Sequence, residues 1–186
     1  MKIEEKPKPI AVPVVLGAVI KNNDLLLINR HNPPFCGLWG MPGGKIHYGE
    51  HLDEAVRREI WEECHIKTRW VKLCGVVTEN LYLDQNEIMH YLLHICQLKP
   101  ISWKIESSVE GKVAWFAISR LAVYRHLMIP SDFIMLKRLV LTQPNRFYYR
   151  CEVVAKANHY QIKSFRSLDN ETGINYHYLW RITHSM

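Results

Sequence analysis

The stretch Gly43–Ile66, GGKIHYGEHLDEAVRREIWEECHI, joins a glycine pair to an acidic, helix-like segment. Between Glu50 and Glu63 there are six acidic residues and two arginines, a net charge of −4 in a chain of formal net charge +6. Glu59, Glu62 and Glu63 are spaced i, i+3 and i+4, so a helix places their carboxylates on one face. Like charges at this spacing repel one another, and hard divalent ions such as Mg²⁺ are the cations that such oxygen ligands bind.

The spacing of these residues resembles the Nudix box. Gly44 is followed after five residues by Glu50, and after seven more by Arg58-Glu59-Ile60-Trp61-Glu62-Glu63. The preceding Trp39-Gly40-Met41-Pro42-Gly43-Gly44 is similar to the lead-in of that family. His65 stands where the family has glycine. Because that position is normally left-handed, we expect histidine to cost about 1 kcal/mol at the helix end and to leave the acidic set intact.

The resemblance implies a metal site on this helix. Glu59 and Glu63 would be the principal Mg²⁺ ligands, with Mn²⁺ as a substitute, and Glu62 would be a ligand or the general base. A backbone carbonyl near Gly44 would complete the site, which accounts for glycine where the backbone must approach closely.

Arg58 is expected to orient the carboxylates rather than to react. Glu54 and Glu62 lie four residues on either side of it, and Glu50 is a further candidate partner. Glu50 and Arg58 are therefore assigned a supporting role inside the active site.

Two further site residues come from loops. Nudix enzymes often use an additional acid late in the domain, and Glu106 and Glu110 precede the strand predicted at Lys112. Glu110, beside Gly111, is the preferred metal ligand of the two. Arg30 ends a predicted strand beside the proline-containing segment His31–Gly37 and is a candidate for binding a substrate phosphate.

Apolar alternation and turn residues predict an α/β protein. The expected strands are residues 11–20, 25–30, 38–42, 70–78, 88–98, 112–117, 147–155, 160–168 and 176–182. The expected helices are residues 52–64, 119–124 with Ser119 as N-cap, and a segment after Asp132 that ends near Leu141. Asn80–Glu87 is interpreted as a loop. The Nudix resemblance implies an α-β-α sandwich with a mixed sheet, to which the last strands add a short C-terminal β-rich extension.

The domain organisation follows from composition. We expect an N-terminal tail at residues 1–10, a Nudix domain at 11–142, and a basic, aromatic extension at 143–186 that begins with the breaker Gln143-Pro144-Asn145. From Lys137 onward the chain has a net charge of +5. Such charge attracts a polyanion or phosphate-rich substrate, or simply solvates a β surface. Phe147, Val153 and Phe165 are expected to pack on the main domain or on a second subunit, which leaves a homodimer open.

The compartment is inferred from the N-terminus and the cysteines. MKIEEKPKPI has no apolar signal-type core, and Val12–Ile20 is too short to span a bilayer. The five cysteines are scattered, without a CxxC pair, so reduced thiols are expected and a zinc site is not. We therefore expect a cytoplasmic protein without membrane contact.

The resemblance implies Mg²⁺-dependent hydrolysis of a pyrophosphate bond in a nucleoside diphosphate linked to another group. Nucleoside triphosphates, nucleotide sugars and ADP-ribose are the substrate classes considered. Leu81-Tyr82 stands where many ADP-ribose enzymes have a proline. An RNA-directed hydrolase that uses the basic extension is an alternative. A ligand-sensing regulator is another, but a β-rich extension does not suit a DNA-binding winged helix.

Overall fold

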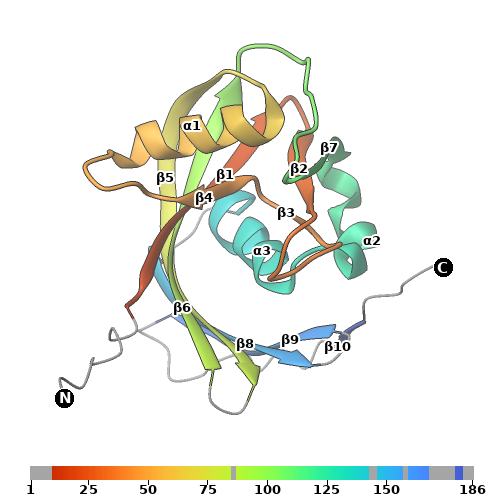
Figure 1. Cartoon of the computed structure of the whole chain (residues 1–186). Coiled ribbons are helices and arrows are strands. Elements are labelled where there is room, and N and C mark those ends of the chain that lie inside the picture. The colour runs from red at the N-terminus through yellow and green to blue at the C-terminus, as the bar shows by residue number, and fades with distance from the viewer. Residues whose placement is uncertain (1–9, 85–86, 143–145, 157–158, 168–178, 182–186) are drawn as a thin grey trace.

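The protein is described by a computed structural model that covers residues 10–84, 87–142, 146–156, 159–167 and 179–181. Its strands are β1 (Val12–Lys21), β2 (Asp24–Arg30), β3 (Trp39–Gly40), β4 (Gly43–Lys45), β5 (Thr68–Asp84), β6 (Glu87–Pro100), β7 (Gly111–Ala117), β8 (Tyr148–Lys156), β9 (His159–Ser167) and β10 (Leu179–Arg181). They form one sheet in the order β10-β9-β8-β5-β6-β1-β2-β3, with β4 paired to β1 and β7 to β2 (Figure 1). The β1–β6 and β5–β8 pairs are parallel and the other pairs antiparallel, so the predicted mixed sheet is confirmed.

Helices cover both faces of this sheet. They are α1 (Leu52–Cys64), α2 (Leu121–Tyr124) and α3 (Pro130–Met135), and α3 continues as a π-helical turn at Leu136–Val140. Alternate residues of β1 divide between two cores, because successive side chains of a strand point to opposite faces. Val15 and Val19 pack in the core that contains α1, whereas Val14 and Ala18 pack in the core that contains α3. This arrangement confirms the α-β-α sandwich.

The hairpin β5–β6 is longer than predicted. Asn80–Glu87 was expected to be a loop, but β5 continues to Asp84 and β6 begins at Glu87. The poor strand propensity of Asn80 is overridden by pairing on both sides, since it lies opposite His90 of β6 and Glu152 of β8. Leu81 beside it is fully buried.

The segment after β7 also departs from the prediction. Ser119 lies in a short 3₁₀ turn, Ile118–Arg120, and α2 begins at Leu121 with Arg120 at its N-cap and no side-chain cap. The predicted second helical piece is confirmed as α3, with Pro130 in its first turn. Among the described helices, none combines the length and apolar character that a membrane span requires.

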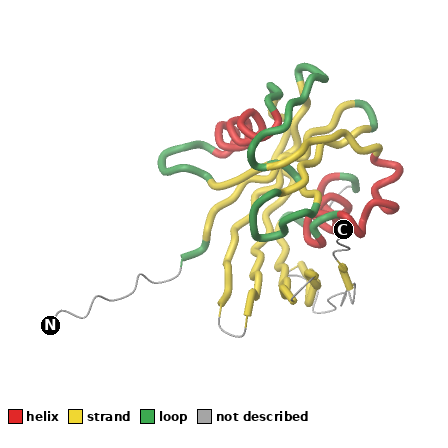
Figure 2. The backbone as a smooth tube through the Cα atoms, turned by 45° about the vertical axis from the view of Figure 1, so that its right-hand side comes forward, coloured by secondary structure: helices red, strands yellow, loops and turns green. Residues whose placement is uncertain are grey.

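The extension joins the main sheet. The predicted hairpin is confirmed as β8–β9, and β8 pairs in parallel with β5, from Val76 opposite Tyr148 to Tyr82 opposite Val154. In Figure 2 the two strands lie at the bottom of the view, beside the end of the β5–β6 hairpin where β5 finishes. Val153 and Phe165 are buried in the same core as α3, which confirms that they pack on the main domain. Phe147 is 53% exposed at the entry to β8, so it is not buried in the main domain, and the alternative of packing on a second subunit stays a prediction.

This packing predicts the outcome of two alanine substitutions in the extension. Phe165→Ala should lower the free energy of unfolding by about 3–5 kcal/mol, because it removes a buried ring that stacks on Tyr149 at 5.1 Å between centroids. Phe147→Ala, the matched control, should change it by less than about 0.5 kcal/mol. Urea unfolding followed by far-UV circular dichroism measures both. An unchanged midpoint for Phe165→Ala would show that the extension does not share the core.

Candidate active site

Helix α1 has defined ends that hold its acidic face in place. At its start the carboxylate of Glu54 accepts a hydrogen bond from the backbone N–H of His51 at 3.1 Å. At its end His65 is left-handed, with φ 53°, and its N–H donates to the carbonyl of Trp61 at 2.9 Å. The expected left-handed histidine is thus confirmed, and the missing family glycine does not alter the direction of the helix end.

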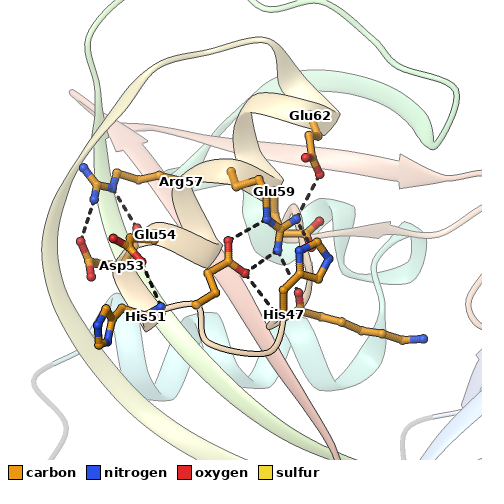
Figure 3. Close-up of polar contacts among 10 residues, drawn as sticks. His47, His51, Asp53, Glu54, Arg57, Glu59 and Glu62 are labelled. Atoms are coloured by element: carbon orange, nitrogen blue, oxygen red, sulfur yellow. Dashed lines mark hydrogen bonds and ion pairs between the residues drawn. The ribbon is translucent and has the colours of Figure 1, made fainter.

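The guanidinium of Arg58 binds three acidic residues around it, two of which, Glu59 and Glu62, are labelled in Figure 3. It donates two hydrogen bonds to Glu50, at 2.8 and 2.9 Å, in a bidentate pair. Its Nη1 donates to Glu59 at 2.8 Å and to Glu62 at 3.1 Å. A further bond reaches the carbonyl of Lys45 at 3.0 Å. The predicted pairs with Glu50 and Glu62 are present, whereas the predicted partner Glu54 is engaged at the helix start instead.

The glycine pair lies directly against the helix. The N–H of Gly43 donates to Glu63 at 2.7 Å, and its φ of 151° would place a Cβ against the carbonyl of Val15. A Cβ on Gly44 would lie 2.5–2.6 Å from the carboxylate atoms of Glu59. Glycine is therefore required at Gly43, where a side chain would meet backbone, whereas a side chain at Gly44 would displace the carboxylate of Glu59.

The acids differ in their protonation behaviour. The hydrogen bonds from Arg58 lower the pKa of Glu50 to about 2. Burial raises the pKa of Glu59, which is 8% exposed, and the nearby carboxylates of Glu62 and Glu110 add to the rise. Burial raises the pKa of Glu63, which is 1% exposed, to about 8, against the lowering effect of the Gly43 N–H. A cation placed beside these two buried acids would favour their charged forms.

The acidic helix face opens on a cavity of about 530 Å³. Its outer wall contains Gly44, Lys45, Arg58, Glu59 and Glu62 from the box, with Glu110 from the loop before β7. Arg30 at the end of β2 also lines it, as do Pro33, Pro34 and Phe35 that follow. Most of the residues predicted for the site therefore line one cavity. The exceptions are Glu50, which binds Arg58, and Glu63, which accepts a hydrogen bond from Gly43.

The two late-loop acids are separated by the structure. Glu110 lines the cavity, and its charge raises the pKa of both Glu59 and Glu63. Glu106 is exposed to solvent and pairs with Lys104 at 2.7 Å. The preference for Glu110 over Glu106 as a site residue is thus supported by position.

The inner end of the cavity contains two acids that the sequence analysis missed, Glu79 of β5 and Asp132 of α3. Asp132 accepts a hydrogen bond from the N–H of Met41 at 2.7 Å. Burial raises its pKa to about 7, and the charge of Glu79 contributes to the rise. Burial likewise raises the pKa of Glu79, whose Oε2 has no hydrogen-bond partner among the described residues.

One signal for Glu79 was present in the sequence. Val77, Glu79 and Leu81 alternate along β5, and the two apolar members are fully buried. An acid at a core-facing position of such a pattern is costly unless it is neutral or paired, so it marks a site worth examining. Asp132 carried no comparable signal, because an acid in the first turn of a helix is ordinary.

The residues present fit a divalent cation in their chemistry, although they are not gathered around one point. Carboxylates and a closely approaching backbone supply oxygen ligands, the kind that Mg²⁺ and Mn²⁺ bind. The missing side chain at Gly44 leaves room beside Glu59. Across the part of the chain that the structure describes, no three acidic, histidine or cysteine side chains lie close enough to hold a metal. In this arrangement Arg58 binds Glu59 and Glu62, and the N–H of Gly43 binds Glu63.

Comparison with known proteins identifies the class to which this fold and site belong. The family model for the NUDIX domain matches residues 11–139. The chain therefore belongs to the NUDIX family, and the resemblance of the Gly43–Ile66 stretch is confirmed.

Individual relatives cover the chain in part. An ADP-ribose pyrophosphatase of Methanocaldococcus jannaschii is 34% identical over 100 residues, which are 54% of this chain and 57% of the relative. An NAD-capped RNA hydrolase NudC of Haemophilus influenzae is 32% identical over 69 residues, 36% of this chain and 26% of the relative. A crystal structure of a MutT protein from Bacillus halodurans superposes with a TM-score of 0.67 and 23% identity over 86% of this chain and 99% of that chain, which supports the fold. The chain thus spans little more than half of the length of the first relative.

The raised pKa of Asp132, one of the two inner acids, predicts how the free energy of unfolding depends on pH. The pKa of Asp132 is raised from 3.8 to about 7 in the folded protein, so its contribution to stability is full below about pH 4 and is lost as the pH rises to 7. Asp132→Asn removes this loss and keeps an oxygen for the Met41 N–H. The difference in unfolding free energy between variant and parent should therefore shift in favour of the variant, by up to about 4 kcal/mol from pH 4 to 7.

Urea unfolding at half-unit pH steps measures this difference. Asp53→Asn, at a carboxylate paired with Arg57 on the exposed side of α1, is the matched control and should show no such trend. A difference that stays constant with pH for Asp132→Asn would contradict the assignment of a neutral, buried acid.

Proposed function

We propose that this protein hydrolyses the pyrophosphate bond of a nucleoside diphosphate linked to another group, with Mg²⁺ or Mn²⁺ as the cofactor. The observation that carries the proposal is the single cavity in which Glu59, Glu62 and Glu110 meet Arg30 beside the glycine pair. Membership of the NUDIX family and the named activities of the relatives support the same reaction class.

The charge of the cavity supports a need for a cation. Five carboxyl groups line it (Glu59, Glu62, Glu79, Glu110 and Asp132), against three basic side chains (Arg30, Lys45 and Arg58). Two of the five are the inner acids, which burial keeps neutral over part of the pH range. The outer three still repel a pyrophosphate, and Arg58 is already occupied by carboxylates. A bound divalent cation would reverse the sign of this wall.

Each residue of the box has a role in this proposal. Glu59 and Glu63, with Glu62, Glu110 and a backbone carbonyl near Gly44, would hold the metal. Magnesium would neutralise the pyrophosphate oxygens and lower the pKa of a bound water. Glu62, whose side chain is 53% exposed, is both a ligand candidate and the carboxylate best placed to pass a proton to solvent. Glu50 and Arg58 would hold Glu59 and Glu62 in position.

Arg30 would bind the substrate on the other side of the bond. Its guanidinium lines the cavity, and its charge lowers the pKa of both Glu63 and Asp132, so it lies within electrostatic reach of the outer and the inner acids. A planar guanidinium is suited to two oxygens of one phosphate. The phosphates would therefore lie between Arg30 and the acidic helix face, and the remainder of the substrate would occupy the rest of the cavity.

A substrate panel tests the proposal. ADP-ribose, an NAD-capped RNA oligonucleotide and a set of nucleoside triphosphates should be incubated with the protein, and the products separated by chromatography. We expect cleavage between two phosphates of at least one compound in Mg²⁺ or Mn²⁺, none after chelation, and recovery when the metal is restored. Glu59→Gln and Glu63→Gln should each lower kcat by at least ~100-fold, because transition-state electrostatics are lost.

Asp53→Asn is the control for these two variants, since it alters an exposed carboxylate of the same helix. Turnover without metal, or near-full activity of Glu59→Gln or Glu63→Gln, would rule out the assigned metal site. No cleavage of any compound by the parent protein would rule out the proposed reaction for this panel.

The late-loop acids provide a second matched pair of variants. Glu110→Gln should lower kcat by ~10-fold or more, because the carboxylate faces the cavity and acts on Glu59 and Glu63. Glu106→Gln should leave kcat within about twofold, because its carboxylate pairs with Lys104 in solvent. Equal kinetics for the two variants would remove Glu110 from the ligand set.

A further inference from the structure

The extension touches the cavity wall through one residue of β9, Tyr160. Its hydroxyl accepts a hydrogen bond from the backbone N–H of Phe35 at 2.9 Å, across 125 residues of sequence. The two rings are also in contact, with centroids 4.3 Å apart and planes tilted by 49°. Phe35 lines the cavity but lies outside the family's acidic box, and Tyr160 lies outside the matched residues 11–139.

The backbone of Phe35 needs such support. Its φ is 67°, in the left-handed region, where a bulky residue such as phenylalanine is rare. Strained conformations of this kind persist only where surrounding contacts hold them. The Tyr160 hydroxyl and ring supply contacts from a different strand, and Phe35 is only 6% exposed beneath them.

The same loop holds Arg30. The carbonyl of Pro34, the residue before Phe35, accepts a hydrogen bond from Nε of Arg30 at 3.1 Å. The backbone of Arg30 is fixed as well, by bonds to Leu38 and from Gly37 at 3.0 and 2.7 Å. Since Nε is engaged, the position of the Pro34 carbonyl sets the plane of the guanidinium. Its terminal nitrogens have no hydrogen bond to another described residue, and Arg30 lines the cavity.

We propose that Tyr160 is a positioning residue for substrate binding. It holds Phe35, which fixes the Pro34 carbonyl, which in turn orients Arg30 toward a phosphate of the substrate. The extension thereby contributes to affinity for the phosphates without touching the reacting atoms. The identity of the ligand group as a phosphate rests on the proposed function, but the mechanical path from Tyr160 to Arg30 rests on the contacts alone.

A conservative substitution of Tyr160 distinguishes the contribution of its hydroxyl from that of its ring. Tyr160→Phe keeps the packing against Phe35 and removes only the acceptor for its N–H. Tyr148→Phe is the matched control, since it removes a hydroxyl of the same extension that lies 2.7 Å from Thr78 Oγ1 and away from the cavity lining. Arg30→Gln removes the charge at the end of the proposed path. Thermal unfolding of all variants checks that each one is folded.

The first readout is binding of inorganic pyrophosphate in the presence of Mg²⁺, measured by calorimetry, which requires no turnover and no particular base. We expect Tyr160→Phe to raise Kd about fivefold, the scale of one lost hydrogen bond, and Arg30→Gln to raise it by about tenfold or more. Tyr148→Phe should leave Kd unchanged. Because the two residues act in series, the double variant Tyr160→Phe/Arg30→Gln should bind no more weakly than Arg30→Gln alone, within about twofold.

The second readout is the kinetics of whichever compound of the panel is cleaved. Tyr160→Phe should raise KM by a similar factor and leave kcat within about twofold, since the metal site is untouched. The proposal would be overturned if Tyr160→Phe bound pyrophosphate with the same Kd as the parent protein, or if Arg30→Gln did. It would also be overturned if the increase in Kd of the double variant equalled the product of the two single increases. An inactive parent protein with the expected binding pattern would instead reject the proposed function and retain the role of Tyr160.

Discussion

The repulsion among carboxylates on one face of α1 is the constraint on which the rest of the site depends. Glu59, Glu62 and Glu63 are forced together by the helical repeat, and two of them are almost completely buried. Arg58 relieves part of this repulsion by binding Glu59 and Glu62, and it is itself held by the bidentate pair with Glu50. Burying unpaired charge is so unfavourable that such a face persists only with partners. Part of the compensation comes from the chain, and the proposed metal would supply the remainder.

The supporting parts of the fold serve this constraint. The glycine pair brings backbone against Glu59 and Glu63, because the absent side chains leave room for the two carboxylates. The β1 strand contributes to both the core that contains α1 and the core that contains α3, and the acids of α1 and the inner acids line one cavity. The wall that completes the cavity is formed by the loop after β2, which is stabilised from the extension.

What could be predicted from the sequence was local, and what could not was tertiary. The bounds of α1 and the left-handed His65 follow from local sequence rules and agree with the structure. Helical spacing also places Glu59, Glu62 and Glu63 on one face, but it does not predict that their carboxylates bind Arg58 and the Gly43 N–H rather than meeting at one point. The length of β5 did not follow, because Asn80 becomes a strand residue only when β6 and β8 pair on both sides of it. Glu54 was assigned to Arg58 by spacing alone, yet the N–H groups at the helix start compete for the same carboxylate. Asp132 lines the cavity and Tyr160 contacts Phe35 in its wall, both from distant elements, which no spacing rule encodes.

The parallel pairing of β8 with β5 has a consequence for how the protein is made. Val76 pairs with Tyr148, so this pairing brings together two residues that are more than seventy positions apart in the chain. Contacts of such long range form late in folding, because the entropy of closing the segment must be overcome first. During synthesis the acidic helix emerges from the ribosome well before β9, which carries the tyrosine that holds the cavity wall. The nascent chain therefore passes through a stage in which the box has been synthesised while the strand that secures the cavity wall has not.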